Sequence, residues 1–164
     1  NINACYLVGQ HFDLSDNQIE KGIAMFTPSS HRLLLVDHPK LTLIDDTYNA
    51  NPEGVVCAIE YMRRFSGRKI VVLGDMLELG NEEASVYMSL VPTIIDAEIS
   101  LFLTYGSRGK HLSSEMVTFL NFEKRDLLHA FLKDELKPED VVLVKGSRGM
   151  RMEKTVEYVK SIVN

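Results

Sequence analysis

Residues 70–74 read Ile-Val-Val-Leu-Gly, a nearly continuous run of β-branched and aliphatic side chains that a glycine ends. A half-exposed strand alternates apolar and polar residues, whereas a strand buried on both faces carries a run of this kind. Residues 141–144, Val-Val-Leu-Val, repeat the pattern. The two runs therefore predict two central strands of a parallel sheet, each followed by a polar loop that contains glycine.

Shorter apolar runs and helical patterns alternate around these two strands. Further strands are predicted at residues 33–36, 41–44, 99–104 and 116–120, and helices at 52–65, 82–91, 123–136 and 148–163. A four-residue turn separates the first two of these runs, as in a hairpin or an edge pair. Alternating strands and helices imply right-handed parallel crossovers. We therefore predict an α/β fold, namely a Rossmann-like, open, mostly parallel sheet of about six strands flanked by helices.

The composition limits the class of protein. The chain has 164 residues, of which 45% are apolar and 25% charged, as in globular proteins large enough to bury a real core. The net charge of −5, from 18 basic and 23 acidic residues, argues against broad attraction to nucleic acid or anionic lipid. No run approaches the roughly 18 to 20 apolar residues that a membrane span needs. We expect neither a nucleic-acid partner nor membrane insertion.

The two cysteines, Cys5 and Cys57, lie far apart, and no CxxC or cysteine–histidine spacing accompanies them. This pattern argues against a disulfide framework and a structural zinc site, and it fits a reduced, cytoplasmic setting. The five histidines form no pair with the spacing of metal ligands. We therefore predict no metal-binding residues in this chain.

Residues 1–30 are predicted to form a separate piece. Apolar side chains recur at helical spacing in two short segments within residues 1–26, and Ser15 is a suitable N-cap for the second. The turn residues at 27–31 end this helix and form a linker. The piece is too short to be a domain, and the chain starts at Asn1 without a methionine. We expect a fragment that carries the end of a neighbouring domain.

Three strand ends carry polar sequence of the kind that binds ligands at the carboxyl edge of an open α/β sheet. The first is residues 45–52, Asp-Asp-Thr-Tyr-Asn-Ala-Asn-Pro, whose carboxylates, phenol and amides could hold ribose hydroxyls, hydrated magnesium or a nucleobase. A turn that caps the following helix explains the same residues equally well. The second is residues 74–80, where a surface turn with solvated acidic residues is the alternative interpretation.

The third loop, residues 145–149, reads Lys-Gly-Ser-Arg-Gly before the closing helix. Two cations and a hydroxyl between glycines at a helix N-terminus favour an anion-binding cradle, because glycine lets the backbone approach and the cations add charge. The loop does not match the GxxxxGK[ST] phosphate loop, since Lys145 precedes the glycine. A plain exposed helix start is the competing interpretation. Residues 105–111 form a similar basic loop with glycines. A lone loop of this kind is more often a solvated surface than a ligand site.

The three loops together resemble one protein family. DDTYNANP at 45–52, LGDMLELG at 73–80 and KGSRG at 145–149, in this order and at this spacing, resemble the C-terminal domain of the Mur ligases. The resemblance covers residues 31–164, and residues 1–30 resemble the helical end of the family's central ATPase domain. Within the family, the combination is similar to the branch that adds D-alanyl-D-alanine to UDP-N-acetylmuramoyl-tripeptide.

This resemblance implies a bacterial, cytoplasmic, ATP-dependent amide ligase of peptidoglycan precursor synthesis. In such a ligase ATP and magnesium, bound mainly by the central domain, phosphorylate a carboxylate of the tripeptide, and the amine of D-alanyl-D-alanine attacks the acyl phosphate. The chain lacks the phosphate loop of the central domain, so the resemblance implies a fragment that is inactive alone. Its partners would be its own central and N-terminal domains, and we expect a monomer.

The resemblance also assigns site residues. Arg32 would contact the nucleotide, and Asp46 would bind its ribose hydroxyls. The other residues expected to line the ATP side of the closed cleft are Tyr48, Asn49 and Asn51. The residues expected at the reaction centre, or at the carboxylate of the dipeptide, are Lys145, Ser147 and Arg148, since an arginine fork suits a carboxylate.

Residues 81–94 depart from the family, because Ser85, Val86 and Tyr87 stand where a histidine-bearing helix is common. The role of this segment stays open, and packing alone would explain it. Two other functions also stay open. One is a sister ligase of the folylpolyglutamate or cyanophycin synthetase type, and the other is a non-catalytic α/β module that presents these loops to a partner.

Overall fold

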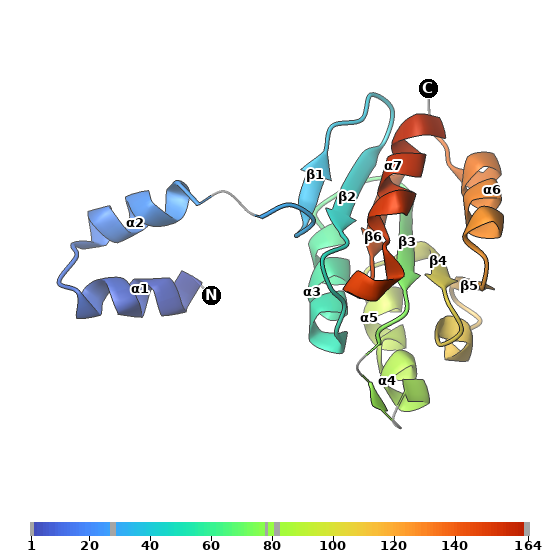
Figure 1. The fold of residues 1–164 in the computed structure, drawn as a ribbon, viewed down its shortest axis with the longest axis horizontal. Helices are drawn as coiled ribbons and strands as arrows, with labels where there is room; N and C mark the ends of the chain where they lie inside the picture. Colours follow the sequence, from blue (N-terminus) through green and yellow to red (C-terminus); the bar gives the residue numbers. More distant parts are fainter. Residues whose placement is uncertain (1, 27–28, 78, 81–82, 163–164) are drawn as a thin grey trace.

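The computed structural model describes residues 2–26, 29–77, 79–80 and 83–162 (Figure 1). Several predicted positions lie outside these ranges: Thr27 and Pro28 of the linker, Glu78 of the second loop, the helix start at residue 82, and Val163. Within the described ranges, no helix is both long and apolar enough to cross a lipid bilayer.

A six-stranded sheet with the order β1-β2-β6-β3-β4-β5 forms the centre of the molecule. Its strands are β1 (Leu34–Val36), β2 (Thr42–Asp46), β3 (Lys69–Gly74), β4 (Ile99–Tyr105), β5 (Thr118–Phe122) and β6 (Val141–Lys145). The edge strand β1 is antiparallel to β2, and all other neighbouring pairs are parallel. The predicted open, mostly parallel sheet is confirmed, although β5 begins two residues later than the run that predicted it.

Helices cover both faces of the sheet (Figure 1). One face carries α3 (Pro52–Met62), α4 (Glu83–Ser89) and α5 (Val91–Asp96), and the other carries α6 (Arg125–Glu135) and α7 (Glu153–Ile162). Successive residues of β3 point to opposite faces, so Val71 and Leu73 join the first core and Ile70 and Val72 join the second. This double burial explains the continuous apolar run in β3.

The closing helix begins five residues later than predicted, at Glu153 instead of residue 148. A 3₁₀ turn, η3 (Arg148–Met150), comes first, and Arg151 then adopts a left-handed conformation with φ of 49°. The packing of Met152 accounts for this irregular segment. Its side chain is buried, and its Cγ lies within 2.8 Å of the position that a Cβ atom on Gly74 or Gly146 would occupy. Gly74 and Gly146 thus leave room for the side chain of Met152 in the core. The helical spacing of apolar residues in the sequence does not reveal this packing.

The predicted helix at 82–91 corresponds to α4, and a further helix that the sequence did not predict, α5, follows it. Within the described residues, α4 ends at Ser89 and α5 begins at Val91, with Pro92 in its first turn. Proline has no backbone N–H and clashes with the preceding turn, so it fits a helix start and not a helix interior. Tyr87 of α4 is fully buried in the core, as the packing interpretation of this segment expects.

The N-terminal residues form the two predicted helices, α1 (Ile2–His11) and α2 (Asp16–Ala24), which lie apart from the sheet and its helices (Figure 1). They touch where Gly9 receives the side chain of Ile19, which is 4% exposed. Apolar side chains of this hairpin, among them Val8, Phe12 and Ile23, line an open groove of about 790 Å³. Phe12 is 70% exposed and Met25 82%, so this hairpin leaves most of its apolar surface uncovered.

Candidate functional site

A polar cleft of about 480 Å³ opens at the carboxyl ends of β2 and β6. These adjacent strands send their following helices, α3 and α7, to opposite faces of the sheet, so the two connecting loops separate and leave a crevice. Ligands of open α/β sheets bind at such crevices. The residues that line the cleft are Arg32, Leu33, Asp46, Tyr48, Asn49, Asn51, Gly54, Cys57 and Lys145.

The cleft gathers six of the eight site residues expected from the sequence. All five cofactor-binding candidates line it, and so does Lys145 from the set expected at the reaction centre. Ser147 and Arg148 do not line it. Three lining residues were missed, namely Leu33, Gly54 and Cys57. The helical spacing of three between Gly54 and Cys57 was the available indication that both sit on the face of α3 next to the polar loop.

Lys145 and Asp46 form a buried ion pair at the floor of the cleft. Lys145 Nζ lies 2.5 Å from Asp46 Oδ2 and donates a second hydrogen bond, of 3.0 Å, to the carbonyl oxygen of Asn49. The parallel register sets the two residues opposite each other, since Asp46 of β2 pairs with Lys145 of β6. Among the described residues these contacts use two of the three ammonium hydrogens, so the third is available to a ligand.

Asn51 caps the following helix and also lies at the cleft. Its side chain caps α3, because Oδ1 accepts a 2.8 Å hydrogen bond from the N–H of Gly54, and Pro52 follows in the first turn. The same residue lines the cleft. A Cβ atom on Gly54 would overlap Asn51 Oδ1 and lie 3.7 Å from Lys145 Nζ, so glycine keeps this wall of the cleft open.

Arg32 and Tyr48 stand together in the cleft. The guanidinium carbon of Arg32 lies 3.9 Å from the centre of the Tyr48 ring, within the range of a cation–π contact. Tyr48 is 46% exposed, so the pair presents a planar cation and a phenol to solvent. Flat charged and aromatic surfaces of this kind suit stacking or hydrogen bonding with a planar or anionic ligand.

Ser147 joins three loops and is buried. Its Oγ accepts a 3.0 Å hydrogen bond from the N–H of Leu77 and donates a 3.4 Å bond to the carbonyl oxygen of Ala50. The predicted anion cradle does not lie at the start of the closing helix, since residues 148–150 form η3, and Arg151 and Met152 stand between η3 and α7. Arg148 is exposed on η3.

Asp75, in the second polar loop, is buried and bound internally. Its carboxylate accepts the backbone N–H groups of Ser107 and Arg108 at 3.0 and 3.1 Å. Burial raises the pKa of the Asp75 carboxyl, and these backbone hydrogen bonds oppose the rise. The interpretation of this loop as a surface turn with solvated acids is therefore wrong for Asp75, which holds the loops after β3 and β4 together.

Tyr87 supports the same loop from α4. Its hydroxyl oxygen accepts a 3.0 Å hydrogen bond from the N–H of Met76, and burial raises the pKa of Tyr87 to about 12. The sequence marked this position only as a departure from the family.

Among the described residues, no group of three His, Cys, Asp or Glu side chains is placed to hold a metal ion.

The fold and the cleft define a class: a Rossmann-like α/β domain with a polar ligand site at the crevice between two parallel strands. The chain belongs to the Mur ligase family. Residues 31–148 match the family model described as "Mur ligase, glutamate ligase domain", and the fold is that of the family's C-terminal domain.

Curated relatives similar to this chain carry the name of one branch of the family, and solved structures of that branch share its fold. The UDP-N-acetylmuramoyl-tripeptide–D-alanyl-D-alanine ligase of Bacillus subtilis is 33% identical over 99% of this chain and 37% of its own length. MurF of Acinetobacter baumannii superposes with a TM-score of 0.83 at 23% identity, over 93% of this chain and 35% of that chain. MurF of Thermotoga maritima, in complex with ADP, superposes with a TM-score of 0.78 at 24% identity, over 94% of this chain and 35% of that chain. The chain thus spans about a third of the length of these relatives.

Proposed function

We propose that this chain is the C-terminal part of an ATP-dependent ligase that joins D-alanyl-D-alanine to UDP-N-acetylmuramoyl-tripeptide in the bacterial cytoplasm. The curated relatives that carry this name support the proposal, because one of them aligns with 99% of the chain. The observation that carries it is the cleft itself, which gathers six residues that the family resemblance assigns to the site.

The cleft is proposed to bind ATP from one side. Asp46 would accept hydrogen bonds from ribose hydroxyls, because a carboxylate offers acceptors only. Arg32 and Tyr48 would contact the nucleotide at the mouth, and the amides of Asn49 and Asn51 would complete the wall. The solved structure of the Thermotoga maritima relative contains ADP, which is consistent with a nucleotide in this family.

The reaction proposed is amide formation through an acyl phosphate. ATP converts a carboxylate of the tripeptide into a better leaving group, and the amine of the dipeptide displaces phosphate. Lys145 and Arg148 are proposed to face the reaction centre or the carboxylate of the dipeptide, where fixed cations would neutralise charge. Because the Ser147 hydroxyl already bonds to Leu77 and Ala50, we assign Ser147 to holding the loops in place.

Residues 1–30 are proposed to be the end of the central ATPase domain, and residues 31–164 the C-terminal domain. The uncovered apolar groove of α1 and α2 supports this division, since exposed apolar surface of this kind marks an interface. The central domain would supply the phosphate loop and the magnesium site. The fragment alone would then lack one wall of the ATP site and be inactive, and the whole ligase would act as a monomer.

The proposal is tested with the intact ligase that carries this chain. We expect phosphate release that requires ATP, D-alanyl-D-alanine and a UDP-N-acetylmuramoyl-tripeptide together. The control reactions replace the dipeptide with glutamate or arginine–aspartate mixtures and the acceptor with a folate or cyanophycin primer. Release with one of these substrates, and none with the muramoyl tripeptides, would assign the chain to a sister ligase. No release with any of them would favour a binding module.

A further inference from the structure

Arg32 lies between two residues with unusual backbone conformations. His31 has a φ of 66° and Leu33 a φ of 47°, both in the left-handed region that residues with a Cβ atom adopt rarely. We call residues 31–33 the hinge segment, because they connect the helical hairpin to β1. Such a conformation persists only where surrounding contacts impose it.

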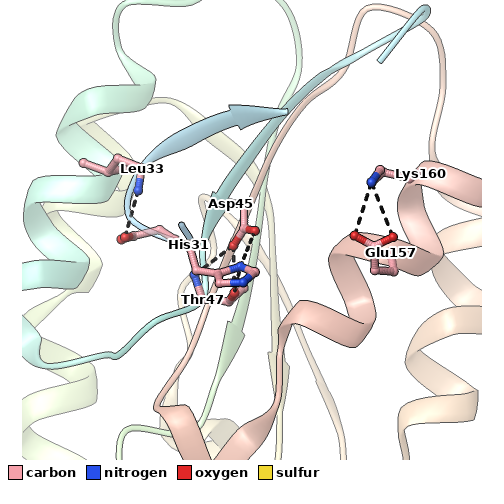
Figure 2. Close-up of polar contacts among 7 residues, drawn as sticks. His31, Leu33, Asp45, Thr47, Glu157 and Lys160 are labelled. Atoms are coloured by element: carbon pink, nitrogen blue, oxygen red, sulfur yellow. Dashed lines mark hydrogen bonds and ion pairs between the residues drawn. The ribbon is translucent and has the colours of Figure 1, made fainter. Parts of the chain in front are cut away.

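The two aspartates that end β2 supply these contacts, one to each side of Arg32. Asp45 Oδ2 lies 2.7 Å from His31 Nδ1, and Asp46 Oδ1 accepts a 3.1 Å hydrogen bond from the N–H of Leu33 (Figure 2). A third bond, of 3.0 Å, runs from the N–H of Tyr48 to the carbonyl oxygen of His31. The hinge segment is therefore tied at both ends to the loop that forms the cleft.

Asp45 is itself held in position. Its other oxygen, Oδ1, accepts hydrogen bonds from the N–H and the hydroxyl of Thr47, at 3.1 and 2.7 Å, and Asp45 is only 3% exposed. Figure 2 shows the imidazole of His31 beside this carboxylate and the side chain of Thr47. Because a carboxylate only accepts hydrogen bonds, the proton of the short contact is on His31 Nδ1.

We propose that His31 and Asp45 are positioning residues that hold Arg32 in the cleft and so increase the affinity for ATP. The proposal rests on the proposed function, since it takes ATP as the ligand of the cleft. The geometry supports it because the bonds on both sides fix the backbone of Arg32 at the point from which its side chain reaches the Tyr48 ring. The conformation of the hinge segment and the occupancy of the cleft are then coupled.

The first test measures the hinge segment without any nucleotide. His31→Gly removes the imidazole but allows a φ of 66° at no steric cost, so the variant separates the contact with Asp45 from backbone strain. Amide hydrogen exchange by NMR on the 164-residue chain should be at least 10-fold faster for the N–H groups of Tyr48 and Leu33. Glu157→Gln, which alters an exposed ion pair with Lys160 far along the chain, serves as the control (Figure 2).

The second test uses steady-state kinetics of the intact ligase. We expect His31→Gly to raise the KM for ATP about 5-fold and Arg32→Ala about 10-fold, with kcat at saturating ATP within twofold of the parent. The double variant should resemble Arg32→Ala, because two residues that act through one side chain are not additive. Asp45→Asn should keep the KM for ATP within threefold of the parent, since its amide oxygen still accepts from Thr47 and its N–H donates to His31 Nδ1 once the imidazole proton has moved to Nε2.

The outcomes separate this proposal from the proposed function. If Arg32→Ala raises the KM for ATP and His31→Gly leaves both KM and amide exchange unchanged, the positioning role is wrong while the nucleotide site stands. If Arg32→Ala leaves the KM for ATP unchanged, the nucleotide assignment fails and this proposal fails with it. A loss of kcat in His31→Gly at unchanged KM would also overturn the proposal, because it would place His31 in the chemical step.

Discussion

Asp46 and Lys145 neutralise each other inside the protein, so each is stable there only in the presence of the other. Their side chains are 11% and 6% exposed. The same carboxylate holds the hinge segment through Leu33 and is the proposed partner of ribose hydroxyls. One residue therefore connects folding, hinge geometry and the ligand site, and its substitution affects all three.

Asp46→Ala should lower the free energy of unfolding by about 3 kcal/mol, because it leaves a buried ammonium without its partner. Urea denaturation of the 164-residue chain measures this change. Glu157→Gln, which removes one member of an exposed pair, should stay within about 0.5 kcal/mol of the parent. A loss below about 1 kcal/mol for Asp46→Ala would mean that Lys145 finds another partner or reaches water.

Among the elements, α3 depends on its first turn both for stability and for the shape of the cleft. The capping bond from Gly54 to Asn51 and the proline after it begin the helix where the polar loop ends. The loop DDTYNANP thus combines a structural cap with a wall of the proposed ligand cleft, so substitutions in it need to separate the two roles.

Asn51→Ala and Asn51→Ser separate these roles. Alanine should cost about 1 kcal/mol of stability through loss of the cap, whereas serine should cost less than about 0.5 kcal/mol because it caps well. Both variants lose the amide, so both should raise the KM for ATP in the intact ligase. The comparison of urea denaturation with kinetics checks this, and equal KM values in parent and serine variant would remove Asn51 from the nucleotide site.

The contact between α6 and α7 predicts a dependence of stability on pH. His129 stacks on Tyr158 with ring centres 4.0 Å apart, and burial, assisted by the charge of Arg125, lowers the pKa of His129 below its usual 6.5. Below pH 6.5 the unfolded chain then binds the proton more readily than the folded chain, so the free energy of unfolding falls as the pH is lowered.

Urea denaturation between pH 7 and 5 should show this fall, and His129→Gln should make it shallower. His11→Gln is the matched control, because His11 is exposed on α1. If both variants keep the slope of the parent, the acid sensitivity comes from other groups. A steeper fall in His129→Gln than in the parent would contradict the lowered pKa of His129.

At the scale of the whole molecule, the helical hairpin and the α/β body differ in how well they bury apolar surface. The body encloses two cores on either side of its sheet. The hairpin shields Ile19 but leaves Phe12 and Met25 largely exposed. The body is therefore expected to be stable by itself, and the hairpin to be completed by the rest of the ligase.

Phe12→Ser tests this division. In the 164-residue chain the substitution should change the unfolding free energy of the body by less than about 0.5 kcal/mol, because Phe12 is 70% exposed. In the intact ligase the same substitution should lower the free energy of unfolding by about 2 kcal/mol, because burying a phenylalanine side chain contributes about that much. Thermal unfolding of both proteins measures the difference, and equal effects would argue that no other domain covers Phe12.

Local patterns were sufficient to predict the architecture. The doubly buried runs of β3 and β6 predicted parallel strands because continuous apolar sequence is stable only when both faces of a strand are covered. Motifs at the strand ends placed the ligand site at the carboxyl edge of the sheet, since parallel strands end at one edge. The helix start at Pro92 was readable from proline chemistry but was not predicted, whereas the start of α7 at Glu153 depends on the packing of Met152 against two glycines.

The sequence by itself therefore determined the α/β class, the order of its elements and the polar loops that could bind a ligand, because these depend on local periodicity and on turn chemistry. It did not determine which loops meet. The pairing of β2 with β6 sets Asp46 against Lys145, and the hinge segment contacts the end of β2 through His31 and Asp45. Contacts between residues up to 99 positions apart depend on strand order and register, which only the folded sheet establishes.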